Sequence, residues 1–290
     1  MTMTQNSHDE ELVAALANEV RERRVILFVG SGGSANLSLP TWEDFIARLG
    51  EELGFEPHEF LGLSQDFRSL AEYYRLEQVS IDALCQKMGR DWNVDDATLD
   101  GSEVHRLLVR LDFPLIYTTN YDHLLESAYE RSGRRFNKVV SARDIARSDP
   151  ALPTIVKFHG DLDDPGSVVL AETDYFRRLS FDEPLDIKLA ADAFARAVLF
   201  LGYSVSDINL RLLLYRLRRI WLESSYEKSR PRSYVYITPP NPVQERILGS
   251  WDVVPLTTAT GDGAADVLSF LNRLHTAVRS TTISSWRIEK

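Results

Sequence analysis

Residues 116–126, IYTTNYDHLLE, decide the fold of this chain. The stretch begins as an apolar segment typical of a buried strand and ends as the first turn of a helix. Between the two, residues 118–122 carry five successive side chains that can form hydrogen bonds. In α/β folds, ligands bind outside the carboxyl ends of the strands. The stretch therefore predicts an α/β fold with functional side chains at this strand-to-helix junction.

Three further apolar runs end in polar clusters of the same kind. VILFV is followed by the glycine loop Gly30-Ser-Gly-Gly-Ser34, TIVKF by His159-Gly-Asp161, and AVLFL by Gly202-Tyr-Ser-Val-Ser-Asp207. Continuous apolar runs of this length are typical of strands covered on both faces, and helical periodicity fills the intervals between them. We predict a Rossmann-like, mostly parallel sheet with helices on both faces.

The chain also contains a long interval without a clear strand. Residues 55–112 show apolar side chains at helical spacing and are predicted to form a smaller helical insertion module, together with part of 171–196. Residues 1–54 and 113–278 then make the Rossmann-like domain. The predicted tail, residues 279–290, could also serve as an oligomer contact through Trp286.

Composition narrows the class of protein. The 290 residues are 44% hydrophobic and carry a net charge of −10, which disfavours direct binding of a nucleic-acid backbone. A single cysteine, Cys85, excludes an internal disulfide and paired-cysteine zinc sites. The N-terminal residues do not resemble a signal peptide, and no apolar run reaches the length of a membrane span. We therefore expect a cytoplasmic protein without a membrane contact.

Each polar cluster taken alone has a simpler structural explanation. The glycine loop lacks the third glycine of G-x-G-x-x-G, because Ala35 stands there, and it lacks a P-loop lysine, so it could be only a tight turn. Ser204 and Asp207 could cap a helix, as could Asn120, and His159 could be a core histidine. Four such clusters at four strand ends together favour a ligand site.

These motifs resemble a known family. GSGGS with LPTW, TTNYD with LLE, KFHGDL and LFLGYSVSD, in this order over residues 25–260, resemble the sirtuin-like, NAD-dependent superfamily. The resemblance is greatest to its prokaryotic branch of NAD-hydrolysing antiphage defence proteins. It implies a Rossmann-like site for NAD+ as substrate.

The resemblance also implies roles for individual residues. The catalytic asparagine and histidine correspond to Asn120 and His159, and the aspartate that binds the nicotinamide carboxamide corresponds to Asp122. The residues around the remainder of the dinucleotide correspond to Gly30, Ser31, Gly32, Ser34, Trp42, Gly202, Ser204 and Asp207. Sirtuin deacetylases carry paired zinc cysteines, which this chain lacks. This departure favours hydrolysis or cyclisation of NAD+ over peptide deacylation, with no metal.

The chemistry of the residues agrees with that assignment. Cleavage of the nicotinamide–ribose bond builds an oxocarbenium-like charge on the ribose, and nicotinamide leaves neutral, so no strong acid is needed. Asn120 would orient a water or a ribose hydroxyl, and His159 would accept its proton. The rate should then fall as the pH drops through about 6–7.

Two alternatives remain at this level: a non-catalytic sensor of NAD or ADP-ribose, and, less favoured, an NAD-dependent protein deacylase. A free NADase would be toxic to its own cell, so its activity must be gated. We expect gating by assembly into a homo-oligomer. The resemblance adds a separately encoded partner such as a helicase-type ATPase.

Overall fold

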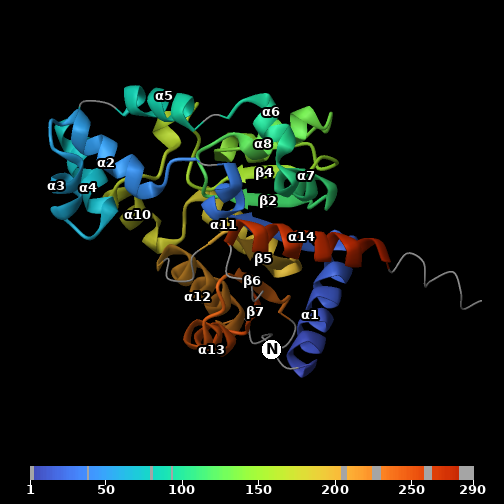
Figure 1. The fold of residues 1–290 in the computed structure, drawn as a ribbon. Helices are drawn as coiled ribbons and strands as arrows, with labels where there is room; N and C mark the ends of the chain where they lie inside the picture. The colour runs from blue at the N-terminus through green and yellow to red at the C-terminus, as the bar shows by residue number, and fades with distance from the viewer. Residues whose placement is uncertain are drawn as a thin grey trace, which may run out of the picture.

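Seven parallel strands form one sheet at the centre of the molecule (Figure 1). The computed structural model describes residues 3–37, 39–78, 81–92, 94–203, 208–223, 230–257 and 263–280. The spatial order of the strands is β3-β4-β2-β1-β5-β6-β7. The strands are β1 (Val25–Val29), β2 (Leu115–Thr118), β3 (Asn137–Val139), β4 (Thr154–Lys157), β5 (Ala197–Leu201), β6 (Ser233–Ile237) and β7 (Val253–Thr257). The predicted α/β class with a parallel sheet is confirmed.

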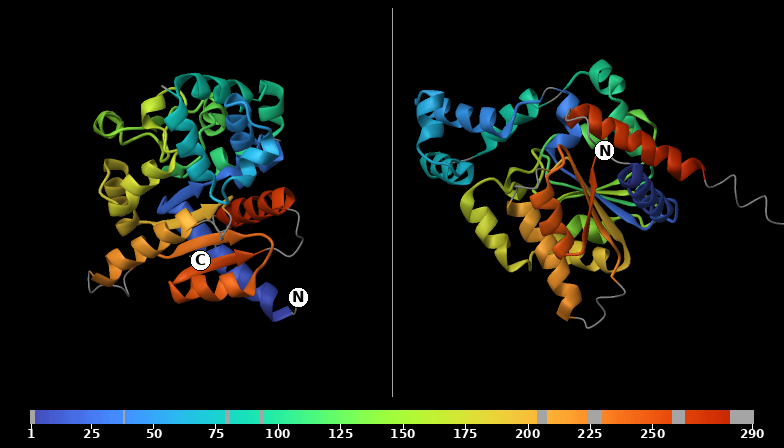
Figure 2. Two further views of the ribbon diagram at one scale, coloured as in Figure 1. Left: turned by 90° about the vertical axis from the view of Figure 1, so that its left-hand side faces the viewer. Right: turned by 60° about the horizontal axis from the view of Figure 1, so that its bottom comes forward.

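Helices cover both faces of this sheet (Figure 2). One face packs against α1 (Met3–Arg21), α7 (Glu103–Arg110), α8 (Leu124–Arg131) and α14 (Gly263–Ser280). The other packs against α11 (Pro184–Ala195), α12 (Ile208–Glu223) and α13 (Pro242–Ser250). None of the described helices is long and apolar enough to cross a membrane.

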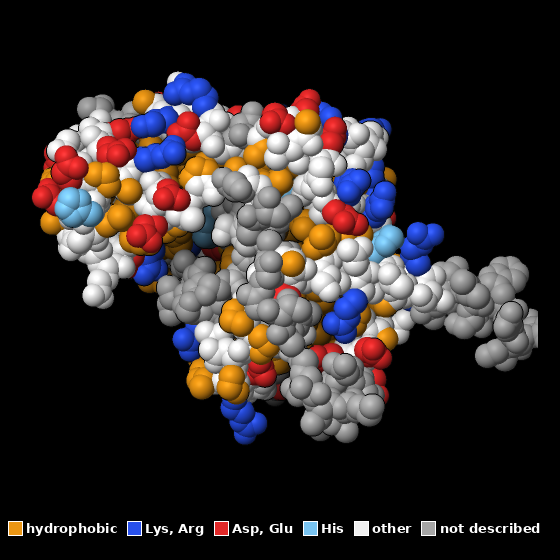
Figure 3. Space-filling view, in the orientation of Figure 1, with side chains coloured by type: hydrophobic (Ala, Val, Ile, Leu, Met, Phe, Trp, Pro, Cys, Tyr) orange, Lys and Arg blue, Asp and Glu red, His pale blue; other side chains and the backbone are white. Residues whose placement is uncertain are grey.

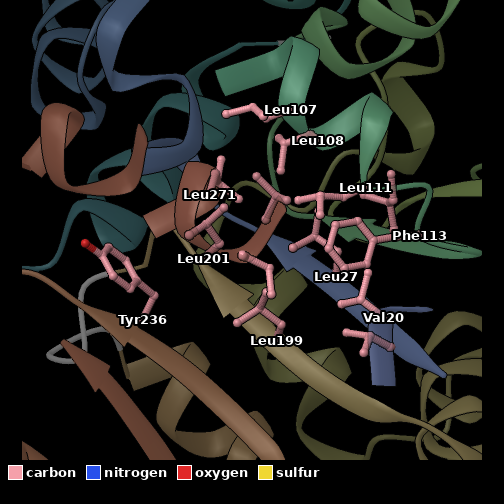
Figure 4. Packing of buried hydrophobic residues seen from close by; sticks show 14 of the residues in the cluster. Val20, Leu27, Leu107, Leu108, Leu111, Phe113, Leu199, Leu201, Tyr236 and Leu271 are labelled. Carbon is pink, nitrogen blue, oxygen red and sulfur yellow. The ribbon is translucent and has the colours of Figure 1, made fainter. Parts of the chain in front are cut away.

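The strand sequences explain the two-sided burial. Successive side chains of a strand point to opposite faces, so a strand between two helical layers must be apolar at every position. In β1, Val25, Leu27 and Val29 join one core, and Ile26 and Phe28 join the other. Figure 4 shows Leu27 in the first core beside residues of α1, α7 and α14.

A separate group of helices projects from one side of the sheet domain, shown at the left of Figure 1. We define the helical module as α2–α5, residues 42–91. It has its own apolar cluster, which includes Phe45, Phe60, Leu70 and Met88. Its helices are α2 (Trp42–Glu52), α3 (Pro57–Gly62), α4 (Phe67–Glu77) and α5 (Asp82–Asp91). The remaining short helices are η1 (Ser31–Leu37), α6 (Asp96–Gly101), α9 (Ala142–Arg147), η2 (Pro165–Ser167), α10 (Glu172–Arg177) and η3 (Arg178–Ser180).

The apolar contacts of the helices give the module boundaries that differ from the predicted range of 55–112. Helix α2 belongs to the module because Phe45, Ile46 and Leu49 lie in its cluster. Helix α7 instead packs on the sheet, because Leu107 and Leu108 face the main core. Both helices are amphipathic, and sequence periodicity does not tell which apolar surface such a helix covers. Within 171–196, α10 contacts α4 of the module, whereas α11 lies on the sheet.

Candidate active site

The four predicted clusters begin at one level of the sheet. Val29 of β1 pairs with Thr118 of β2 and with Leu201 of β5, and Thr118 pairs with Lys157 of β4. These four residues end their strands. The chain segments that follow them therefore emerge side by side at the carboxyl edge, as the sequence predicted.

The glycine loop and the turn at Gly202 meet where the strand order reverses. From β1 the chain builds β2, β3 and β4 on one side and β5, β6 and β7 on the other, so the reversal lies between β1 and β5. Ligands of doubly wound sheets bind at such a point. Gly202 has φ +76°, and a Cβ there would lie 2.3 Å from the backbone N of Gly33. Only glycine fits this contact without a backbone shift.

Most N–H groups of the glycine loop are already used within the protein. The backbone N–H of Gly30 donates to Leu201 O, that of Gly32 to Gly202 O, and that of Gly33 to Gly30 O, each at 2.9 Å. The ring of Tyr203 also covers Gly30, since a Cβ on this glycine would lie 2.9 Å from Tyr203 Cζ. The glycines thus allow the two loops and the Tyr203 ring to pack closely, and three N–H groups of the glycine loop are not free to bind a ligand.

The two serines of the loop differ in position. The side chain of Ser31 is exposed at the start of η1. Ser34 is only 4% exposed, and its Oγ lies 3.5 Å from Nε2 of His105 on α7. Ser34 therefore packs toward α7, and its side chain offers no support for a direct contact with a ligand.

The stretch 118–122 uses four of its five polar side chains to hold its own shape. Thr118 Oγ1 donates to Val29 O at 2.9 Å and accepts from the backbone N–H of Asn120 at 3.0 Å. Thr119 Oγ1 shares a hydrogen bond of 2.9 Å with the Tyr203 hydroxyl. The Tyr121 hydroxyl donates to Val169 O at 2.5 Å. Asp122 Oδ1 accepts from the backbone N–H of Leu124 at 3.2 Å, at the start of α8.

Asn120 is the exception in this stretch. Its side chain is half-buried, and its amide has no hydrogen-bond partner among the described residues. It does not cap α8, whose N-cap is His123. An amide held between fixed neighbours and left without a protein partner is suited to bind a substrate group.

His159 stands in the corresponding place after β4. Its imidazole is half-buried, with ring centroids 6.0 Å from Phe158 and 5.6 Å from Tyr175, and no described residue hydrogen-bonds to its nitrogens. Burial, together with the nearby Arg178 guanidinium, lowers the pKa of His159 to about 3. The imidazole is thus neutral at physiological pH and, with this pKa, is a weak base that takes a proton only from a strongly acidic group, such as an oxygen that has just bonded to a carbocation-like centre. An acid limb of the rate at pH 6–7, expected from an ordinary histidine, is therefore not expected from His159 in this state.

Asp122 lies in a buried charged environment. Burial raises the pKa of its carboxyl group, and the positive charge of Lys157 opposes this rise. Lys157, at the end of β4, is fully buried and forms an ion pair of 3.1 Å with Glu126 on α8.

Trp42 borders the same loop from the module. Its ring lies 5.1 Å from that of Phe45 and stacks at 6.3 Å on Tyr121, which also stacks on Trp92 at 5.8 Å. Tyr121 thus joins the loop of Asn120 to the helical module. The predicted Ser204 and Asp207 lie outside the described residues, as do residues 281–290 of the predicted tail, which include Trp286, whereas residues 279 and 280 belong to α14.

One group of side chains has the spacing of a metal site. His123, Asp161 and Asp163 each bring a ligand atom within 4.8 Å of the others. Lys138 Nζ already forms ion pairs with Asp161 at 2.6 Å and with Asp163 at 3.2 Å. The lysine supplies the positive charge there, so the geometry gives no separate argument for a cation.

Sequence reasoning did not assign three residues that build this site. Tyr203 covers Gly30, Lys157 anchors the loop after β2, and Arg178 donates to the backbone O of Phe158 and pairs with buried Asp186. The signal for Lys157 was available, since a lysine in the apolar run TIVKF must be buried if the run is a central strand. Tyr203 and Arg178 had no comparable signal.

Charges on the face shown in Figure 3 are mixed. Acidic and basic side chains are interspersed over the module and the sheet domain. Within the described residues of this face, no continuous basic stripe of the kind that tracks a phosphate backbone is visible.

Comparison with known proteins agrees with the fold and the site. Residues 114–256, from the start of β2 to β7, match the family model of the SIR2-like domain. This part of the chain is thus similar to the SIR2-like domain, and the sirtuin-like resemblance is confirmed.

Curated relatives resemble most of the chain. It is 28% identical over 245 residues to "NAD(+) hydrolase ThsA" of Bacillus cereus (strain MSX-D12), a match covering 81% of this chain and 47% of the relative. The same name is carried by a relative from Enterococcus faecium, 28% identical over 73% of this chain and 44% of the relative. "Defense-associated sirtuin 2" of Bacillus subtilis is 24% identical over 82% of this chain and 23% of its own length. The chain spans less than half the length of these relatives.

Proposed function

We propose that the protein is an NAD+ glycohydrolase, which cleaves the nicotinamide–ribose bond to give nicotinamide and ADP-ribose or a cyclic form. One observation carries this proposal. Asn120 and His159 follow adjacent strands at the same level, and both side chains are half-buried without a hydrogen-bond partner among the described residues. The names of the relatives support the same activity.

The residues fit a dinucleotide substrate. The glycine loop packs closely against Gly202, and the Tyr203 ring covers Gly30, at the point of strand reversal. An extended ligand would bind beside them, over the carboxyl ends of β1 and β5. Asn120 and His159, on the β2 and β4 side of this point, would then meet the nicotinamide ribose. Gly202 completes the turn beside the glycine loop.

The chemistry follows from these positions. As the bond to nicotinamide breaks, positive charge develops on the ribose. The Asn120 amide orients the attacking water, or a ribose hydroxyl for cyclisation, and the neutral His159 imidazole accepts its proton. The Asp122 carboxylate accepts a hydrogen bond from the carboxamide and orients the leaving group. Because nicotinamide departs neutral, this route needs no metal ion.

The proposed role is an effector of bacterial antiphage defence that acts by depleting NAD+. Relatives named as NAD(+) hydrolases and as a defence-associated sirtuin support it. Such an activity in the cytoplasm must stay silent until a trigger appears. We propose control by assembly, as a homo-oligomer or with a separately encoded partner such as a helicase-type ATPase.

The test is turnover by the purified protein. NAD+ is incubated with the chain, alone and after concentration to favour assembly, and free nicotinamide is measured by chromatography with and without an acyl peptide. Release that does not depend on the peptide is expected. Release only with the peptide would indicate a deacylase, and NAD+ binding without release in every assembly state would indicate a sensor.

A further inference from the structure

A fully buried lysine stands directly behind the proposed active site. Lys157 is the last residue of β4, is 0% exposed, and follows three apolar or small residues of its strand. Removing an ammonium group from water is costly unless charge and hydrogen bonds compensate for it. The groups that contact the Lys157 ammonium should therefore indicate its structural role.

Those partners lie in the loop of residues 119–123 and in the first turn of α8. Lys157 Nζ donates to the backbone O of Asp122 and, at 3.4 Å, to that of Tyr121. It also lies 3.1 Å from Oε1 of Glu126, which is 5% exposed. Among the described residues, Lys157 is the only ion-pair partner of Glu126, and neither oxygen of that carboxylate has a hydrogen-bond partner. The ion pair with Glu126 thus keeps a charged ammonium group in the protein interior. There it donates to two carbonyls of the loop, those of Tyr121 and Asp122.

This arrangement connects the two halves of the proposed active site. The loop that Lys157 holds contains Asn120 and Asp122, and the backbone of Lys157 itself lies two residues before His159. No other described side chain donates to both carbonyls. Lys157 is thus one of the contacts that fix the asparagine loop relative to the histidine, beside the backbone bond from Phe158 N to Thr118 O and the Tyr121 hydroxyl bond to Val169 O.

We propose that Lys157, charge-paired with Glu126, is a positioning residue that holds the loop of Asn120 and Asp122 against the strand of His159 in the geometry of turnover. This inference rests on the proposed glycohydrolase function. The same ammonium also acts on Asp122 through space, because its charge opposes the effect of burial. Glu126 and His123 are the other charged or titratable groups that act on Asp122.

The principal test is a double variant. Lys157→Met alone would leave Glu126 buried without a cation, so it is combined with Glu126→Leu, an apolar replacement of similar volume. The double variant is expected to melt near the wild-type temperature and to lose kcat by about 10- to 100-fold, because a displacement of about 1 Å can cost that much. The KM for NAD+ should change by less than about threefold, since the polar partners of Lys157 among the described residues are Tyr121, Asp122 and Glu126 and do not include the glycine loop or Gly202.

A second variant covers the case in which the double variant does not fold. Lys157→Gln is combined with Glu126→Gln, so that no carboxylate is left buried without a cation; it keeps a hydrogen-bond donor but removes the charge. It is expected to lower kcat and to move the acid limb of kcat/KM to higher pH, because Asp122 loses the cation that favours its ionised form. The matched control is Lys87→Met in the helical module, which removes an ion pair with Glu52 and should leave kcat unchanged.

Wild-type kcat in either folded variant overturns the proposal, and so does a change confined to KM. If the wild-type chain itself releases no nicotinamide, the proposed function fails instead. Lys157 is then judged by hydrogen–deuterium exchange. The double variant should exchange faster over residues 119–126 and as the wild type does over α14, and unchanged exchange over 119–126 overturns the inference.

Discussion

Asn120→Ala and His159→Ala are each expected to lower NAD+ cleavage by at least about 100-fold while the protein stays folded. Both side chains are half-buried at strand ends and make no hydrogen bond to described residues, so their removal breaks no structural contact of that kind. The measurement is nicotinamide release, with melting temperature as the control for folding. Turnover near the wild-type rate in either folded variant would exclude the assigned role of that residue.

The pH dependence of kcat/KM reports on the free enzyme and therefore on His159 as the structure shows it. A histidine of ordinary pKa, about 6.5, would give an acid limb centred there. Burial and Arg178 lower the pKa of His159 to about 3, so this residue should impose no limb between pH 7 and 5. Because burial raises the pKa of Asp122, an acid limb above the range of an ordinary carboxyl group is assigned to this residue and should disappear in Asp122→Asn. A limb at pH 6.5 that persists in Asp122→Asn would contradict the neutral, buried imidazole.

Among the elements, the contact between the loops after β1 and β5 is the tightest part of the site. Gly202→Ala would place a methyl group 2.3 Å from the backbone N of Gly33 and impose φ +76° on a residue with a Cβ. We expect a loss of about 3 kcal/mol or more in the free energy of unfolding and loss of NAD+ binding. Chemical denaturation and calorimetry with NAD+ measure the two effects.

Gly133→Ala is a matched control for that variant. Gly133 follows α8 with φ +65°, and a Cβ there would have no neighbour within 4 Å. Its expected cost is about 1 kcal/mol, from backbone conformation alone, with NAD+ binding retained. Equal costs for the two variants would show that the close approach of the loops is not what Gly202 provides.

The elements were largely predictable because their physical signals are local. The apolar run of β1 is found where the sequence places it, and α2 begins at a capping pair, Thr41 and Asp44, only three residues apart. The boundary of the helical module was not predictable, because the apolar face of α7 could have packed against the module or against the sheet equally well. The meeting of the four motifs at one edge of the sheet could be predicted, because each motif directly follows an apolar run. The packing of the Tyr203 ring over Gly30 could not be predicted, because it depends on side-chain contacts that the spacing of residues in the sequence does not show.

For the whole molecule, treatment with a chelator is expected to leave turnover and melting temperature unchanged. The cluster of His123, Asp161 and Asp163 is compensated by Lys138, and the proposed reaction needs no Lewis acid. The measurement compares kcat and melting temperature before and after dialysis against a chelator. Loss of activity that zinc or magnesium restores would show that this cluster, or another site, holds a required ion.

The stability of the whole molecule should fall in mild acid because two histidines, the buried His105 and the half-buried His159, stay neutral in the folded protein. Burial lowers the pKa of His105 to about 4, as burial and Arg178 lower that of His159 to about 3. Below pH 6.5 the unfolded chain takes up these protons while the folded chain does not. The stabilisation is therefore complete above pH 6.5 and is lost as the pH falls toward the folded values, by about 1.4 kcal/mol per pH unit for each histidine.

His105→Gln isolates one of these contributions. His123 opposes the trend, because Asp161 raises its pKa, but it is present in both proteins and cancels in the comparison. The variant loses its native contacts with Ser102 and Ser34, so it is judged by slope and not by absolute stability. Between pH 6.5 and 5, its free energy of unfolding should fall less steeply than that of the wild type, by up to about 1.4 kcal/mol per pH unit. His58→Gln, at an exposed position of α3, is the control. Identical slopes in the wild type and His105→Gln would mean that His105 takes up its proton in the folded protein. The contact between Ser34 of the glycine loop and His105 of α7 would then be accessible to water.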